Sequence, residues 1–343
     1  MQGAPEALLI RDEHCYSGTD HVLFSVRLFF LLWGLIASSF AWAQSWPTKP
    51  VRIIVAGAPG SSLDIPVRAV GEKLKDRLGQ PIVVENRVAA GGTVATDAAA
   101  KAPPDGYTLV MSFNGPLAYG PFLYSKLPYD PQKDLAAVIL MGGQPFVLGI
   151  PASLGISSLK ELVEMARANP GRLNYASLGN GSGTHITMEL LKSHAKIFML
   201  HIPYPGGVAA STAVATGDVQ AHFAAISTIM PHVRAGRVKL IAMSSAKRFA
   251  LMPEVPTVAE QGFPGFDSFG WNGILAPAGT PREIVVRLNR EINDILQLAD
   301  IRTLLHNNHI EIGGGTPDQF AALIKREAER WGPVIRATGA KLD

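Results

Sequence analysis

The chain has 343 residues, of which 47% are hydrophobic and 17% charged, enough apolar material for one large or two medium cores. Its net charge is only +3, without a basic run or an aromatic RNA-binding pattern, so no nucleic-acid partner is expected. After residue 43, no stretch reaches the roughly 18 apolar residues that a membrane-spanning helix needs.

The N-terminal segment has the three parts of a secretory signal peptide. Arg27 precedes an apolar run over residues 28–40, and Ala41-Trp42-Ala43 follows as an A-x-A cleavage site. We therefore predict that residues 1–43 are removed on export. The only cysteine, Cys15, lies in this segment, so the mature chain is expected to contain no thiol or disulfide.

Apolar strands alternate with helices along the rest of the chain, which predicts a parallel α/β sheet. The strands are expected at residues 51–55, 82–85, 108–112, 147–150, 173–176, 219–224 and 240–244. The helices are expected at residues 62–78, up to about 101, 158–168, after 185 and 230–235, followed by a helical tail.

Four segments have the spacing of a capping box, in which Ser or Thr precedes Glu or Gln by three residues at a helix start. They begin at Ser158, Thr257, Thr280 and Thr316. In the last two, proline follows the threonine, as expected at a first helical position.

Two glycine-rich turns stand out, AGAPGSSLD at residues 56–64 and SLGNGSGTH at residues 177–185. Each follows an expected strand and precedes an expected helix, so each presents free backbone N–H groups at a helix N-terminus, where anions bind. Neither contains lysine or arginine. This indicates reversible capture of a carboxylate by backbone dipoles and hydroxyls, in a cleft beyond the carboxyl ends of the strands.

The candidate ligand contacts of the first turn are Gly60, Ser61, Ser62 and Asp64. A structural alternative is that Ser61 and Asp64 only cap the following helix. The Asp64 carboxylate would repel a bound carboxylate unless a water or a ligand ammonium lay between them.

The candidates of the second turn are Gly179, Asn180, Gly181, Ser182, Thr184 and His185, with an ordinary tight turn as the alternative. His185 and Glu189 are spaced like two metal ligands, but no third ligand is visible, so no metal is expected. No dinucleotide fingerprint, phosphate loop or nucleophile elbow is present, so neither a cofactor nor catalysis is expected. A hydrolase using Ser182 and His185 remains the enzymatic alternative.

Several further segments together carry a family resemblance. They are WPTKPVRIIV, APGSSLD, GQPIVVENR, AAGGTVATDAAAKAPPDGYTL, LNYASLGNGSGTH, IPYPGG, TGDVQAHF, AGRVKLIAMSSAKR, PEVPTVAEQGFPGF and WNGILAPAGTP. The chain resembles the substrate-binding proteins of tripartite tricarboxylate transporters, the Bug family, over residues 46–343.

The resemblance implies a type II periplasmic binding protein, an α/β fold of two lobes with a ligand cleft between them. We expect lobe 1 to comprise residues 46–145 plus 246–343, and lobe 2 residues 146–245. The expected ligand is a small organic acid, and the expected partners are the membrane components of the transporter, with the binding protein itself a periplasmic monomer. A sensor subunit that presents its ligand to a receptor kinase is an alternative.

By the same resemblance, the residues 60–64 turn matches the family's ligand loop. Other family regions that line the cleft supply the remaining candidates, which are Ser112, Asn114, Tyr204, Gly206, Gly207 and, more weakly, Ser227. Tyr204 is alternatively a packed turn aromatic. Trp271 and Asn272, near the crossover between the lobes, are further candidates to face the cleft, with a core tryptophan as the alternative. The first loop departs from the family pattern at Gly57, Ala58, Ser61 and Val67, which makes it the place where ligand choice is expected to differ.

Overall fold

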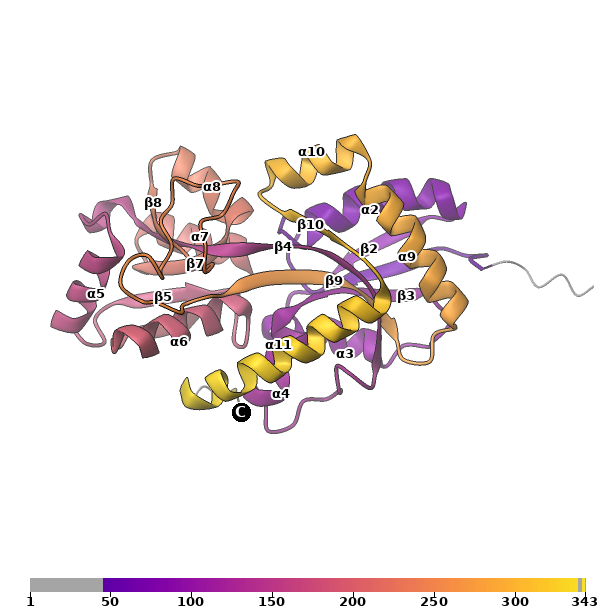
Figure 1. The fold of residues 1–343 in the computed structure, drawn as a ribbon, viewed down its shortest axis with the longest axis horizontal. Helices are drawn as coiled ribbons and strands as arrows, with labels where there is room; N and C mark the ends of the chain where they lie inside the picture. The colour runs from indigo at the N-terminus through magenta and orange to yellow at the C-terminus, as the bar shows by residue number, and fades with distance from the viewer. Residues whose placement is uncertain (1–45, 339–340, 343) are drawn as a thin grey trace, which may run out of the picture. The chain divides into compact units, whose positions relative to one another are not determined.

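The computed structural model describes residues 46–338 and 341–342, and the segment from Trp46 onward forms one compact unit (Figure 1). The expected signal peptide, residues 1–43, lies outside the described residues. Within the described part of the chain, no helix combines the length and apolarity required to cross a bilayer.

The first section of the sheet has the strand order β2-β1-β3-β9-β4, with β10 also paired to β4. Its strands are β1 (Val51–Val55), β2 (Ile82–Asn86), β3 (Thr108–Phe113), β9 (Phe269–Pro277), β10 (Glu311–Gly314) and the first part of β4 (Leu135–Pro151). β1 pairs in parallel with β2 and β3, as expected, but β9 runs antiparallel to both β3 and β4. The expectation of a purely parallel sheet is therefore wrong.

The second section continues from the last part of β4 through β7, β5 and β6, with β8 also paired to β4. The strands are β5 (Asn174–Ser177), β6 (Leu200–Pro203), β7 (Ala221–Ala225) and β8 (Val238–Met243). β5 is parallel to β6 and β7, whereas β4 is antiparallel to β7 and β8. The 17-residue β4 thus belongs to both sections and joins two α/β halves.

Helices cover both halves of the sheet (Figure 1). Those of the first half are α2 (Asp64–Leu78), α3 (Thr93–Ala100), α4 (Gly120–Leu123), α9 (Arg282–Leu296), α10 (Ala299–Asn307) and α11 (Pro317–Thr338). Those of the second half are α5 (Leu159–Ala168), α6 (Gly183–Ala195), α7 (Gly207–Thr216) and α8 (Ile226–Arg234). Single turns are η2 (Ala90–Gly92), η3 (Gly115–Tyr119) and η4 (Ala152–Leu154).

One hydrophobic core fills the first half and two cores lie in the second half. Strands β1 and β3 are buried along almost their whole length because helices pack on both faces, which explains their near-continuous apolar sequences. The strands β9 and early β4 were not expected. Glycines interrupt the apolar pattern of β9, whereas residues 135–141 of β4 form a continuous apolar run that was not assigned. Gly273 of β9 is required by packing, since a Cβ there would overlap the ring of Phe320.

Three of the four expected capping boxes form. Ser158 caps α5 with Glu161, Thr316 pairs with Gln319 at the start of α11, and Thr257 pairs with Glu260 in a turn that does not continue as a helix. The capping box expected at Thr280 does not form, so this prediction is wrong. Its hydroxyl donates to the carbonyl of Pro277, and α9 begins only at Arg282.

Candidate functional site

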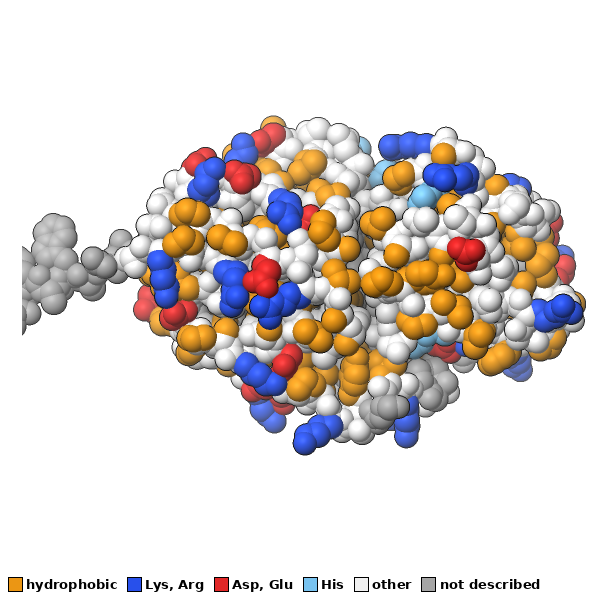
Figure 2. Space-filling model, turned by 180° about the vertical axis from the view of Figure 1, so that it is seen from behind, with side chains coloured by type: hydrophobic (Ala, Val, Ile, Leu, Met, Phe, Trp, Pro, Cys, Tyr) orange, Lys and Arg blue, Asp and Glu red, His pale blue; other side chains and the backbone are white. Residues whose placement is uncertain are grey.

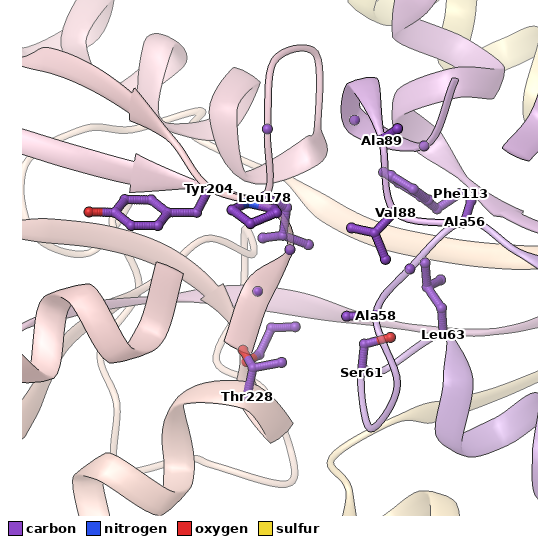
Figure 3. A pocket seen from close by; sticks show the side chains of 18 of the residues that line it. Ala56, Ala58, Ser61, Leu63, Val88, Ala89, Phe113, Leu178, Tyr204 and Thr228 are labelled. Atoms are coloured by element: carbon purple, nitrogen blue, oxygen red, sulfur yellow. The ribbon is translucent and has the colours of Figure 1, made fainter. Parts of the chain in front are cut away.

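A cavity of about 290 Å³, here called the main chamber, lies between the two halves of the sheet (Figure 3). The first half contributes the turn after β1, the turn after β2 and Phe113 at the end of β3, whereas the second half contributes the turns that follow β5, β6 and β7. The lining residues are Ala56–Ala58, Ser61–Leu63, Val88–Gly92, Phe113, Leu178–Asn180, Pro203–Gly207, Ala225 and Thr228. All these turns lie at carboxyl ends of strands, where α/β sheets bind ligands.

Four helices begin at the main chamber, and a fifth, α6, begins at the smaller cavity that adjoins it. Residues at or directly before the starts of α2, α3, α6, α7 and α8 line it or the smaller cavity below it, and these residues are Leu63, Gly92, Gly183, Gly207 and Ala225. Each start carries the positive end of a helix dipole, although the first N–H groups of α2 already donate to the Ser61 carbonyl. None of the described residues that line the two cavities has a charged or imidazole side chain. The arrangement suits an anion bound by backbone dipoles.

The first glycine-rich turn is fixed from behind by Asp64, which is only 3% exposed and lines neither cavity. Its carboxylate accepts hydrogen bonds from the Arg68 guanidinium at 2.9 Å, the Asn86 amide at 2.8 Å and the Gly60 N–H at 2.9 Å. Burial alone would raise the pKa of Asp64, but these bonds hold it below its usual value. Asp64 is therefore ionised and satisfied within the protein, which resolves the repulsion expected with a bound carboxylate.

The second glycine-rich turn is held by uncharged groups instead. The hydroxyl of Ser182 donates to the Gly179 carbonyl at 2.7 Å and accepts from the His185 N–H at 3.3 Å. The hydroxyl of Thr184 accepts from the Leu178 N–H at 3.1 Å. Ser182 caps α6, so its hydroxyl is occupied in the turn.

A stack of three rings supports this turn from below. His185 packs on His201 with ring centroids 4.1 Å apart, and His201 packs on Tyr175 at 4.9 Å. The Gly181 N–H donates to Nδ1 of His185 at 3.2 Å, and Ser177 Oγ lies 2.7 Å from Nε2 of His201. Burial lowers the pKa of His185 to about 4 and that of His201 to about 3, so both rings are neutral near pH 7.

A third turn, residues 88–92, was not among the sequence-based candidates although it lines the main chamber. It meets the second glycine-rich turn directly, since a Cβ on Gly91 would overlap the backbone oxygen of Asn180. Gly91 also has φ of +60°, in the left-handed region that favours glycine. The pair Gly91-Gly92, shortly after β2, is the feature of the sequence from which this turn could have been identified.

Below the main chamber lies a smaller cavity of about 50 Å³, here called the floor chamber. Both chambers share Ser62, Leu63, Phe113, Leu178 and Ala225 in their linings. The remaining lining residues of the floor chamber are Asn114, Gln144, Phe146, Gly183, Thr184, Gly270, Trp271 and Asn272.

The sequence-based candidates thus divide into two groups. Nine of the main candidates line a chamber, and these are Ser61, Ser62, Asn114, Gly179, Asn180, Thr184, Tyr204, Gly206 and Gly207; Trp271 and Asn272 also line the floor chamber. Seven line neither chamber, and these are Gly60, Asp64, Ser112, Gly181, Ser182, His185 and Ser227. Gly60 in this group is exposed, whereas Asp64, Ser112, Gly181, Ser182 and His185 are buried. Ser112, for example, is fully buried and bonds Thr96 of α3 at 2.8 Å.

Tyr204 contributes less of its side chain to the chamber than expected. Its ring packs against the core formed around α7 and β7, and in Figure 3 its hydroxyl points away from the wall formed by Ala58 and Val88. Within this turn, Gly206 lies close to the first half, because a Cβ there would lie 3.4 Å from Cβ of Ala58, whereas Gly207 faces Thr228 and Leu178 of its own half.

No group of three or more histidine, cysteine or acidic residues in the described part of the chain is arranged to hold a metal ion. Nε2 of His185 lies 4.0 Å from Glu189, whose carboxylate instead pairs with Lys192 at 2.6 Å and accepts from the Tyr175 hydroxyl.

Comparisons with known proteins agree on one family. The model of the tripartite tricarboxylate transporter family receptors matches residues 67–340. Protein BugT of Bordetella pertussis is 38% identical over 88% of this chain and 92% of its own length. The solved structure of R. palustris Rpa4515 with adipate has a TM-score of 0.82 at 31% identity, covering 86% of this chain and 98% of that one. MatC from Rhodopseudomonas palustris with bound malate has a TM-score of 0.81 at 32% identity, with 84% and 100% covered.

Proposed function

Because the chain belongs to the tripartite tricarboxylate transporter receptor family, we propose that it is a solute-binding protein that captures one small organic acid in its main chamber. The observation that carries this proposal is the convergence of five helix starts on cavities whose described lining holds no charged or imidazole side chain. Such a site attracts an anion through many weak dipoles and releases it again, as a transport receptor must.

Two relatives with the same fold support a carboxylate as the ligand. Rpa4515 is described with adipate and MatC with bound malate. The main chamber, at about 290 Å³, is at the small end of ligand pockets and fits a molecule of this size class.

The ligand contacts in this proposal are the candidates that line the chambers, together with the residues 88–92 turn. Residues 46–145 plus 246–343 would form lobe 1, and residues 146–245 lobe 2. Their approach would bring Gly91 against Asn180, so that closure completes the ligand's hydrogen bonds and forms the surface that a membrane component of the transporter recognises.

Export is part of the same proposal. The signal peptide at residues 1–43 would direct the chain to the periplasm, where the mature protein would work as a monomer that docks on the transporter.

The proposed role is binding without catalysis. The enzymatic alternative needs Ser182 activated by His185. However, Nδ1 of His185 accepts from the Gly181 N–H, and the Ser182 hydroxyl is bonded to Gly179. The low pKa of His185, about 4, also makes it a weak base.

A thermal-shift screen of the purified mature protein tests the proposal. The panel comprises di- and tricarboxylates, acidic amino acids, aromatic acids and aliphatic acids with one carboxylate. A ligand that binds only the folded state raises its melting temperature, so at least one acid should produce a concentration-dependent shift. Hydrolysis of an ester together with no shift from any acid would favour the enzyme instead.

A further inference from the structure

The floor chamber contains a buried acceptor that no protein group satisfies. Asn272 of β9 is 6% exposed, and its Oδ1 has no hydrogen-bond partner among the described residues. An unsatisfied buried acceptor costs about 1–3 kcal/mol, so such atoms are rare unless a ligand or water meets them. Asn272 lines the floor chamber, where a bound molecule would reach it.

We propose that the floor chamber is a subsite for an uncharged hydrogen-bond donor, and that the captured acid therefore carries one carboxylate and, at its far end, a neutral donor such as a hydroxyl. This inference rests on the proposed function, with the carboxylate held in the main chamber.

The amide neighbours of Asn272 leave little to neutralise a second carboxylate. Asn114 donates through Nδ2 to the Tyr119 hydroxyl at 2.8 Å, whereas Gln144 accepts through Oε1 from the Ile226 N–H at 3.2 Å and offers only its uncharged Nε2 amide as a donor. The first N–H of α8 is thereby occupied. A carboxylate placed here would have its oxygens against the Asn272 acceptor, with which they form no hydrogen bond, whereas a hydroxyl would donate to that acceptor.

Aromatic walls make the floor chamber a poor place for charge. Phe113, Phe146 and Trp271 line it, and their rings lower the local polarity. Burying an unpaired charge in such surroundings costs far more than burying a hydrogen-bonded hydroxyl.

The size of the floor chamber also favours a small terminal group. Its volume of about 50 Å³ accommodates a hydroxyl-bearing end but not the body of an organic acid. The chamber is kept open by Gly183, where a Cβ would lie 2.7 Å from the Phe146 ring and 3.0 Å from Oδ1 of Asn114. The apolar body would then rest in the main chamber against side chains such as Leu63, Val88 and Leu178 (Figure 3).

Calorimetric titration of the mature protein with matched acids tests this inference. One series is hexanoate, 6-hydroxyhexanoate and adipate, and a second, more rigid series is benzoate, 4-hydroxybenzoate and terephthalate. In at least one series, the hydroxy acid should bind about tenfold tighter than the plain acid, and the diacid should bind more weakly than the hydroxy acid.

A variant assigns the difference to its residue. Asn272→Leu should abolish the tenfold ratio between the affinities for the hydroxy acid and the plain acid, both measured on the variant. The control is Asn307→Leu, at an exposed position in α10 that lines neither chamber, and it should leave the whole series unchanged. If Asn272→Leu does not fold, the comparison of acids on the unmodified protein still tests whether the floor chamber prefers a neutral donor.

The outcomes separate this inference from the proposed function. A diacid that binds more tightly than the hydroxy acid in both series, or a hydroxyl that adds nothing, would overturn the subsite and leave acid capture intact. Failure of every acid in these series and in the wider thermal-shift panel would instead overturn the proposed function.

Discussion

The two glycine-rich turns look alike in the sequence but are held in place by different chemistry. The residues 56–64 turn is fixed by an ionised carboxylate, Asp64, paired with Arg68 behind the wall. The residues 177–185 turn is fixed by hydroxyls and by two neutral histidine rings. In both cases the ionisable groups support the backbone and do not line the chamber. An acidic residue near a binding turn can therefore stabilise the turn without contacting the ligand.

Hydrophobic and charged side chains also occupy different parts of the surface around the two halves. Hydrophobic side chains gather along the line where the two halves meet on the face in Figure 2, and most charged side chains lie farther out. Exposed valines of the first and second halves include Val88 and Val208. The uncharged character of the chamber therefore continues onto part of its surroundings.

The strongest effect should be the loss of unfolding free energy in acid. The histidines and Asp64 should contribute to this loss at different pH values. The ordinary histidine pKa is 6.5, and burial lowers it to about 4 for His185 and His222 and to about 3 for His201. The unfolded chain then binds more protons below pH 6.5, so the free energy of unfolding should fall as the pH drops toward 4, by about 2 kcal/mol for each histidine. The folded pKa of Asp64 is also lowered, so its contribution should be lost only below its usual value of 3.8.

Urea unfolding measured between pH 7.5 and 4.5 checks this order. His185→Gln keeps an acceptor near the Gly181 N–H but does not titrate, so it should reduce the slope of stability against pH. The same change at exposed His306 is the control. A stability that stays constant over this pH range would show that the histidines are not held neutral.

The second effect is a loss of ligand affinity when the contact between the residues 88–92 turn and the residues 177–185 turn is disturbed. Gly91→Ala places a methyl group against the Asn180 backbone oxygen, which cannot rotate away. The closed arrangement should become less populated, and affinity for the captured acid should fall on the order of a hundredfold, because the apparent affinity follows the competent fraction. Calorimetric titration measures this loss.

Gly79→Ala provides the matched control for backbone strain. Gly79 has φ of +69°, similar to Gly91, but a Cβ there meets nothing within 4 Å. Equal losses of affinity in both variants would mean that strain, and not the contact with Asn180, is responsible.

A smaller effect is expected from removing the charge behind the first turn. Asp64→Asn leaves the Arg68 guanidinium without its buried partner and weakens the bond to the Gly60 N–H, so unfolding free energy should decrease by about 2 kcal/mol. Glu72→Gln, which breaks an exposed ion pair with Lys75 on the same helix, should cost less than about 0.5 kcal/mol. Chemical denaturation of both variants gives the comparison, and similar costs would contradict a supporting role for Asp64.

The smallest effect is expected at Tyr204. Its hydroxyl points away from the opposite wall, so Tyr204→Phe should change acid affinity by less than about twofold. A tenfold loss on titration would place the hydroxyl on the ligand.

Much of the fold could be predicted from the sequence because its strands are short apolar runs between turn residues. The family and the periplasmic-binding-protein fold are confirmed by the family match and by the solved structures of similar proteins. Strand β1 was predicted with its observed bounds. The antiparallel strand β9 was missed because Gly270 and Gly273, which allow close packing, weaken the apolar pattern that identifies a strand.

The site was less predictable because a turn's sequence does not show which side faces the cavity. Asp64 and His185 belong to the expected turns, yet both side chains lie behind the walls. Conversely, Val88 and Phe113 have no polar group to mark them, and only the fold brings them to the chamber. The assignment of ligand contacts stays a prediction until a bound acid is observed.

The central claim is that the chamber recognises the negative charge of an acid through backbone dipoles. Calorimetric titration with the acid that gives the largest thermal shift, beside its primary amide of nearly the same shape, tests this most directly. We expect the acid to bind at least about a hundredfold more tightly than the amide, since helix starts favour the charged form. An amide that binds as tightly as the acid would contradict it.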